Sequence, residues 1–154
     1  MRTRVGQEQL LASLQGANHR LQYLTQNDWT LLVDRAKQVT FKKGDVLIQQ
    51  ASEAKILYLI AAGKVKVSVL GTALGQIGPG EVCGEMAFLE NSRPSATATA
   101  EEEVQAFAIE WQKLIELFEL FPHVASRFYR SLAVNLSRRL REQIVLRKAH
   151  KTGE

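Results

Sequence analysis

The chain has 154 residues, of which 45% are hydrophobic and 23% are charged, so its length and composition are those of one ordinary globular domain. Its longest apolar run, residues 56–62, is too short to cross a bilayer, which takes about 20 residues, and its basic first residues lead into no apolar signal core. The formal net charge of +4 is concentrated at the end, because residues 127–154 contain 8 Lys and Arg against 2 Asp and Glu.

Residues 1–37 are predicted to form helices that cover a sheet. A first short stripe of leucines stops at Gly16, and Thr25 and Asp28 have the spacing of a capping box that opens a second helix. The side chains expected to point inward are Leu10, Leu11 and Leu14 in the first helix and Trp29, Leu32, Val33 and Ala36 in the second.

Residues 38–110 change to the periodicity of strands. The predicted strands are 39–41, 46–49, 56–60, 64–69, 73–77, 82–83, 96–100 and 104–109. In residues 64–69 the alternation is strict, so Val65, Val67 and Val69 are expected to face a core. Eight short strands, with one helix between the sixth and the seventh, predict a small antiparallel barrel or jelly roll.

Residues 111–148 return to a helical pattern, and residues 149–154 form a tail. A helix over 111–121 is expected to end at Pro122, which starts a long helix over 123–148. Apolar side chains recur every four residues in this long helix, at Val124, Phe128, Leu132, Leu136, Leu140 and Ile144. The stripe is expected either to pack on the chain's own sheet or to form a homodimer through residues 123–148. The basic residues beside it are interpreted as a solvated face rather than as a nucleic-acid or membrane contact.

The strongest candidate site lies in residues 84–97, directly after a Gly-Pro-Gly turn at residues 78–80. Gly84 and Glu85 open one apolar helical turn, and a small-residue strand follows it. Free N–H groups at a helix start favour an anion, and Gly84 allows a ligand to approach the backbone closely.

The order of these residues resembles the phosphate-binding cassette of the cyclic-nucleotide-binding domain family. Residues 84–89, Gly-Glu-Met-Ala-Phe-Leu, fit the first half of the cassette, and residues 95–97, Ser-Ala-Thr, fit its end. The resemblance covers about residues 21–147 and includes the hairpin turn at Gly44 and Asp45. It implies a mainly β fold, an eight-stranded antiparallel jelly-roll barrel with N-terminal helices and a long C-terminal helix, in one domain over residues 1–154. Ala51 departs from the family, which often has glycine after the second strand.

The resemblance also implies roles for individual residues. Glu85 is expected to accept a hydrogen bond from a ribose 2′-hydroxyl, and the amides of residues 84–87 are expected to bind a cyclic phosphate. The family usually has Pro-Arg where this chain has Arg93 followed by Pro94, so the phosphate-binding arginine is displaced by one residue. The predicted ligand-binding residues are Gly84, Glu85, Met86, Ala87, Arg93, Ser95 and Ala96 in the cassette, with Arg139 and Gln143 in the last helix.

Two functions follow from this resemblance. The first is a regulatory sensor that binds cyclic AMP or cyclic GMP without covalent chemistry and signals through its last helix to an unidentified protein partner. The alternative is the same fold without nucleotide binding, because Pro94 replaces the arginine, acting as a protein-interaction module or binding another ligand such as a cyclic dinucleotide.

Other classes of function are not expected. No nucleophile stands at a recognisable spacing from a base, so an enzyme is not predicted, nor is a cofactor. The three histidines and the single cysteine, Cys83, lack metal-ligand spacing, and one cysteine fits a reducing cytoplasm. Too few residues follow the last helix for a helix-turn-helix, so DNA binding is not expected.

Overall fold

The computed structural model describes residue 12 and residues 21–152, with side chains described as far as residue 149. The helix expected around Leu10, Leu11 and Leu14 lies outside these residues, as does the break at Gly16. The described elements are α2 (Gln26–Asp34), β1 (Lys37–Phe41), β2 (Val46–Ile48), β3 (Ile56–Ala62), β4 (Val65–Val69), β5 (Thr72–Ile77), β6 (Val82–Cys83), α3 (Glu85–Glu90), β7 (Thr97–Ala100), β8 (Val104–Glu110), α4 (Trp111–Leu120) and α5 (Pro122–Thr152).

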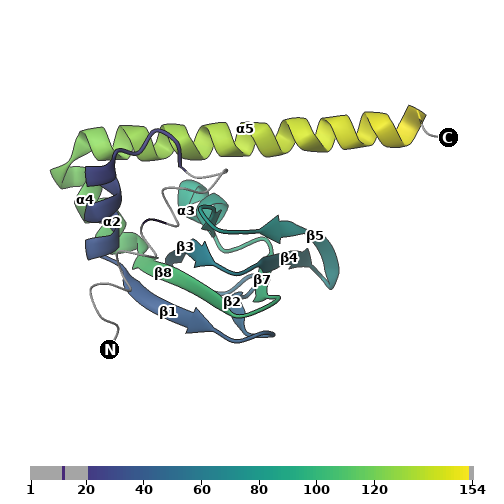
Figure 1. Cartoon of the computed structure of the whole chain (residues 1–154), viewed down its shortest axis with the longest axis horizontal. Helices are drawn as coiled ribbons and strands as arrows, with labels where there is room; N and C mark the ends of the chain where they lie inside the picture. The colour runs from purple at the N-terminus through teal and green to yellow at the C-terminus, as the bar shows by residue number, and fades with distance from the viewer. Residues whose placement is uncertain (1–11, 13–20, 153–154) are drawn as a thin grey trace.

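The eight strands form two four-stranded antiparallel sheets, in the orders β1-β8-β3-β6 and β2-β7-β4-β5 (Figure 1). Strands far apart in the sequence pair in both sheets, as β8 does with β1 and β3. The mainly β, jelly-roll prediction is therefore confirmed. The barrel is not closed, because no ladder joins the two sheets within the described residues, so the arrangement is a jelly-roll sandwich.

Successive side chains of β3 belong to two different core clusters, which explains why its sequence is apolar throughout. Leu57 and Leu59 belong to the core cluster shared with the helices, whereas Tyr58 and Ile60 belong to the cluster between the two sheets. Successive side chains of a strand point to opposite faces, so a strand with both faces covered has no polar side. The apolar run at residues 56–62 is thus a central strand of the sandwich.

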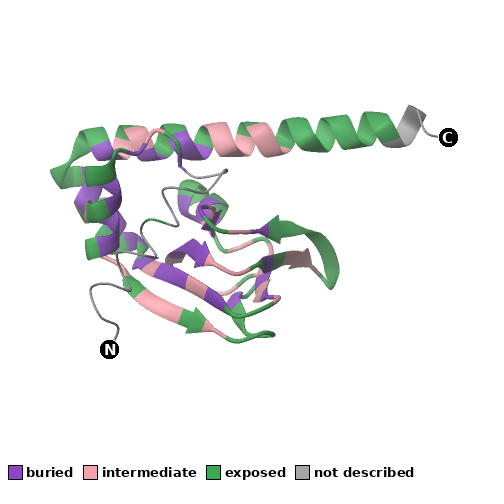
Figure 2. Cartoon of the chain, viewed as in Figure 1, coloured by how far each residue is buried: buried purple, intermediate pink, exposed green. Residues whose placement is uncertain are grey.

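Helix α5 runs along one side of the domain and extends beyond it (Figure 1). Val124, Phe128 and Leu132 are at most 3% exposed and pack in the domain's own core. Every residue from 140 to 149 is exposed, which appears as the green end of the helix in Figure 2. The first half of the predicted apolar stripe is therefore used inside the domain, and only its second half is free for another contact.

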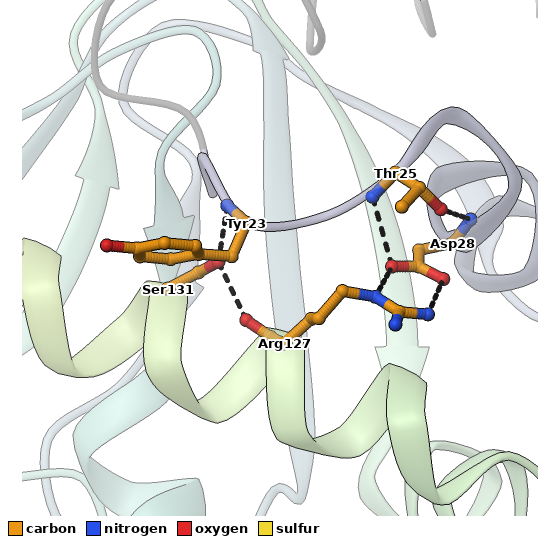
Figure 3. Close-up of polar contacts among 5 residues, drawn as sticks. All are labelled: Tyr23, Thr25, Asp28, Arg127 and Ser131. Atoms are coloured by element: carbon orange, nitrogen blue, oxygen red, sulfur yellow. Dashed lines mark hydrogen bonds and ion pairs between the residues drawn. The ribbon is translucent and has the colours of Figure 1, made fainter.

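The start of α5 is fastened to residues 21–28 by polar contacts (Figure 3). Thr25 and Asp28 form the predicted capping box. The Arg127 guanidinium donates two hydrogen bonds to the buried Asp28 carboxylate, at 2.6 and 2.8 Å, and lowers the pKa of Asp28 against the opposing effect of burial. The Tyr23 amide donates to Ser131 Oγ at 3.1 Å. These contacts hold the first turns of α5 at a fixed place over the sheet.

Candidate functional site

Gly84 forms the tight turn that connects β6 to α3. Its φ of +94° lies in the left-handed region, which glycine adopts without strain. A Cβ at this position would lie 2.8 Å from Ile48 Cδ1 and 3.3 Å from the Ile56 carbonyl oxygen. The glycine is therefore required by the packing of β2 and β3, in addition to the close ligand approach predicted from the sequence.

Two adjoining cavities lie between this turn, the β2-β7-β4-β5 sheet and α5. The cassette pocket has a volume of about 120 Å³ and is lined by Ile48, Val67, Ile77, Cys83, Gly84, Glu85, Met86, Ala87, Pro94, Ser95, Ala96, Thr97, Ala98 and Arg139. The helix cleft, of about 560 Å³, is lined by Val67, Leu74, Gly75, Gln76, Ile77, Glu81, Met86, Asn135, Arg138, Arg139, Glu142, Gln143 and Leu146. Both cavities share Val67, Ile77, Met86 and Arg139, so together they form one continuous site with a small apolar end and a larger polar end.

Arg139 reaches from α5 to the carboxylates of the site. Its Nη1 donates to Glu85 Oε1 at 3.2 Å, and its Nη2 donates to Glu81 Oε2 at 3.3 Å. Glu85 is only 7% exposed, and this burial raises its pKa, although the charge of Arg139 opposes the rise. The structure thus holds a buried carboxylate in the wall of the cassette pocket, paired with a guanidinium of α5 that lines both cavities.

The cassette loop is turned so that Pro94, not Arg93, faces the cassette pocket. Arg93 Nη2 lies 2.7 Å from Glu53 Oε1, and both side chains are largely exposed. The two residues line a separate surface pocket of about 400 Å³ together with Lys55 and Trp111. Neighbouring residues thus point to different sides of the loop, and Arg93, which was predicted to bind the ligand, lies outside the cassette pocket.

Cys83 forms part of the wall of the cassette pocket. Burial, with a smaller effect of the Glu85 charge, raises the pKa of its thiol to about 12, so the thiol stays protonated at neutral pH and is a poor nucleophile. Among the described residues, no three His, Cys, Asp or Glu side chains are grouped so as to hold a metal ion. None of the described helices has the length and apolar character of a membrane span.

Comparison with known proteins identifies the family to which this fold belongs. The family model for "Cyclic nucleotide-binding domain" matches residues 38–120, which is more than half of the chain and includes the whole cassette. This chain belongs to the cyclic-nucleotide-binding domain family.

Two relatives and one solved structure illustrate how this cyclic-nucleotide-binding domain compares with others. It is 36% identical to the "Cyclic AMP receptor protein" of Thermus thermophilus over 107 residues, 66% of this chain and 48% of the relative. It is 36% identical to the "Pycsar effector protein BcPycTIR" of Burkholderia cepacia over 123 residues, 78% of this chain and 39% of the relative. A cyclic nucleotide-binding domain from Methylobacillus flagellatus superposes with a TM-score of 0.74 at 18% identity, covering 92% of this chain and 83% of that one, and supports the fold. The match spans less than half the length of either sequence relative.

Eight of the nine predicted ligand-binding residues of the cyclic-nucleotide-binding domain line the two cavities. Gly84, Glu85, Ala87, Ser95 and Ala96 lie in the cassette pocket, Gln143 lies in the helix cleft, and Met86 and Arg139 lie in both, whereas Arg93 lies outside. Their roles toward a ligand remain predictions.

The prediction from sequence missed further residues of the site. Glu81 bonds to Arg139, and Asn135, Arg138 and Glu142 line the helix cleft. The last three stand four, one and three residues from Arg139 along α5, so helical spacing from Arg139 was a usable signal for Asn135 and Glu142.

Proposed function

We propose that this domain binds a cyclic nucleotide non-covalently between the cassette and α5. The observation that carries the proposal is the buried Glu85 carboxylate, which lines the cassette pocket and bonds at 3.2 Å to Arg139, a residue that lines both the pocket and the helix cleft. An ionised carboxylate has about four acceptor sites, so Glu85, although paired with Arg139, can also accept a hydrogen bond from a ligand in the pocket, such as a ribose hydroxyl. Cyclic AMP and cyclic GMP both supply this group, and the Thermus relative is named for cyclic AMP.

The signal is proposed to pass through α5. A ligand in the helix cleft contacts residues of both the cassette and α5, because Met86 and Arg139 line the same cavity. A ligand that binds more tightly when these two elements are close shifts the population toward that arrangement. The part of α5 beyond residue 139 is exposed and extends past the domain, so its position is open to an unidentified protein partner.

A homodimer through α5 is part of this proposal. The exposed apolar side chains on the free half of the helix are Leu140, Ile144, Val145 and Leu146, each at least 46% exposed. A second copy is proposed to cover this half alone, because Val124, Phe128 and Leu132 already pack inside the domain.

One observation favours a second candidate function. Pro94 occupies the place of the family's arginine, and Arg93 is bonded to Glu53 outside the pocket. A site without its phosphate-binding arginine fits a domain that keeps the fold as a protein-interaction module or that takes a different ligand, such as a cyclic dinucleotide.

Isothermal titration calorimetry with cyclic AMP and cyclic GMP distinguishes the proposed nucleotide binding from the second candidate function. The first proposal predicts micromolar binding of at least one of them, and E85Q is expected to weaken it by about tenfold to a hundredfold, since a hydrogen bond to a charged group contributes ~1.5–3 kcal/mol. E53Q makes the same chemical change outside the cavities and is expected to leave the affinity within about twofold, as is usual for an exposed pair. No heat up to millimolar nucleotide favours the second candidate.

A further inference from the structure

The cassette pocket has few positively charged side chains to balance the negative charges of a bound phosphate and of Glu85. A cyclic phosphate carries one negative charge, and Glu85 in the pocket wall carries another when it is ionised. Of the described residues that line the cassette pocket, Arg139 is the only Lys, Arg or His. Pro94 has neither a charge nor an N–H group to offer. A bound phosphate therefore has one candidate cation in the pocket, and it comes from α5.

Arg93 is held away from this pocket by contacts on both sides of the loop. Its guanidinium bonds to Glu53 at 2.7 Å, and the neighbouring Pro94 carbonyl accepts a hydrogen bond from the Ala51 amide at 2.8 Å. The second bond fixes the loop to the β2–β3 turn. Moving Arg93 into the pocket requires breaking both contacts and turning Pro94 out of the pocket wall.

Arg139, in contrast, is held loosely. Its bonds to Glu85 and Glu81 measure 3.2 and 3.3 Å, whereas charge-assisted N–H bonds to carboxylates are usually about 2.7–2.9 Å long. The Arg127–Asp28 pair of the same helix reaches 2.6 and 2.8 Å. The Arg139 side chain is also 40% exposed, so water or a ligand can reach it.

Glu81 keeps a second partner when Arg139 leaves it. The Gly78 amide donates to Glu81 Oε2 at 3.2 Å, and this is the oxygen that Arg139 Nη2 contacts. Glu81 is also less buried than Glu85, so its charge is less costly without Arg139. The Nη2 end of the guanidinium is therefore the end that can change partner at little cost.

We propose that Arg139 neutralises the ligand's phosphate, exchanging Glu81 for a phosphate oxygen while its other nitrogen keeps Glu85. This inference rests on the proposed function and deepens it. It moves the phosphate anchor from the cassette loop to α5, so that binding of the phosphate itself fixes the position of the helix. The phosphate of the ligand, rather than its base, then couples ligand binding to the position of α5.

The test is calorimetry with two ligands, cyclic AMP and adenosine, on the wild type, R139Q and R93Q. Adenosine has the base and ribose hydroxyls but no phosphate. We expect R139Q to weaken cyclic AMP binding by about tenfold to a hundredfold and adenosine binding by less than about threefold, because among the ligand's own contacts only the charge-assisted bond to phosphate is lost. R93Q, the matched control, is expected to leave both affinities within about twofold. In the R139Q background, the exchange R93P/P94R is expected to restore at least tenfold of the cyclic AMP affinity.

Other outcomes overturn the inference. If R139Q weakens both ligands equally, Arg139 only orients Glu85 toward the ribose. If R93Q weakens cyclic AMP binding and R139Q does not, Arg93 is the phosphate anchor. Both results leave the proposed function intact, whereas a wild-type protein that gives no heat with cyclic AMP or cyclic GMP contradicts the proposed function itself.

Discussion

The β2–β3 turn passes through a left-handed backbone conformation at Ala51, with a φ of +64°. An L-residue pays roughly 1–2 kcal/mol there and glycine does not, although glycine loses more entropy on folding. The family's frequent glycine after the second strand thus has a conformational reason. The same residue donates to the Pro94 carbonyl, so strain at this turn bears directly on the cassette loop.

The first prediction is that A51G stabilises the domain. The net gain is expected to be about 0.5–1 kcal/mol, after the entropy of glycine in the unfolded chain is subtracted. Urea denaturation measures it. Ala54, in the same loop, has no positive φ, so A54G is the control and is expected to lower the free energy of unfolding. Equal losses in the two variants would show that φ at Ala51 is not the controlling factor.

The second prediction concerns Asp28, whose pKa is lowered mainly by the hydrogen bonds from Arg127. A carboxyl with a lowered pKa stabilises the fold at pH values above its unfolded pKa of about 3.9, and this contribution is lost as the pH falls toward the folded pKa. D28N is expected to cost about 2–3 kcal/mol at pH 7, because it breaks a buried charge-assisted pair.

Denaturation of wild type and D28N at pH 7 and near pH 3 tests whether the stabilising contribution of Asp28 is lost as the pH falls. The difference between the two proteins is expected to shrink at the acidic pH. D34N, at an exposed carboxylate near the end of α2, is expected to change the free energy of unfolding by less than about 0.5 kcal/mol at either pH. A pH-independent deficit in D28N would mean that the ion pair is not its cause.

At the scale of the elements, α5 has two halves with different environments. The half from Val124 to Leu132 is a core element, fastened through Arg127 and Ser131 to residues 21–28. Every residue from 140 to 149 is exposed, although Glu142, Gln143 and Leu146 also line the helix cleft. A free helix of this length is marginally stable in water, so a contact that covers its apolar side chains stabilises it.

The third prediction follows from the proposed homodimer. I144D places a charge on the free half of α5 and is expected to halve the mass measured by sedimentation while leaving the fold intact, because Ile144 is 46% exposed. L132D is not a test of association, because Leu132 is 1% exposed and its replacement is expected to unfold the domain. A wild-type protein that sediments as a monomer, or an I144D variant that keeps the dimer mass, contradicts the homodimer.

The periodicity of the sequence was sufficient to locate the helices and strands, but it did not show which elements pack against one another. All eight strands were predicted within about two residues, since alternation and turn residues are local signals, as at 96–100 for Thr97–Ala100. The stripe on α5 was recognised, but its division into a core half and a free half depends on where the sheet ends. The position at which the sheet ends along the helix depends on the tertiary structure, which a four-residue repeat in the sequence does not specify.

At the candidate site, too, the sequence predicted local features but not contacts between distant residues. The cassette residues were predicted because they are contiguous and resemble the family's cassette, and Arg139 because the resemblance extends to the last helix. The Arg139–Glu81 bond joins residues 58 positions apart and was not predicted. Arg93 was predicted to bind the ligand but lies outside the cassette pocket, because the loop turns Pro94 inward, and its bond to Glu53 depends on the β2–β3 turn.

At the scale of the whole molecule, the domain consists of a packed β-sandwich and a long helix whose first half is anchored in the core. The two sheets share one core cluster, and the first half of α5 packs in a second cluster with strands of the β1-β8-β3-β6 sheet, whereas the second half of α5 meets the sandwich mainly across the helix cleft. A ligand in that cleft adds contacts where the two parts otherwise meet through Arg139. The helix is thus the part whose position a ligand can change most easily.

The fourth prediction, that a cyclic nucleotide binds in the cleft and fixes α5, is tested most directly by hydrogen exchange with and without saturating cyclic AMP. We expect slower exchange in two segments at once, residues 84–97 of the cassette and residues 135–148 of α5, with the β1–β8 pair unchanged as an internal control. Protection of the cassette without α5 would contradict the relay, and unchanged exchange in both segments at millimolar ligand would contradict nucleotide binding itself.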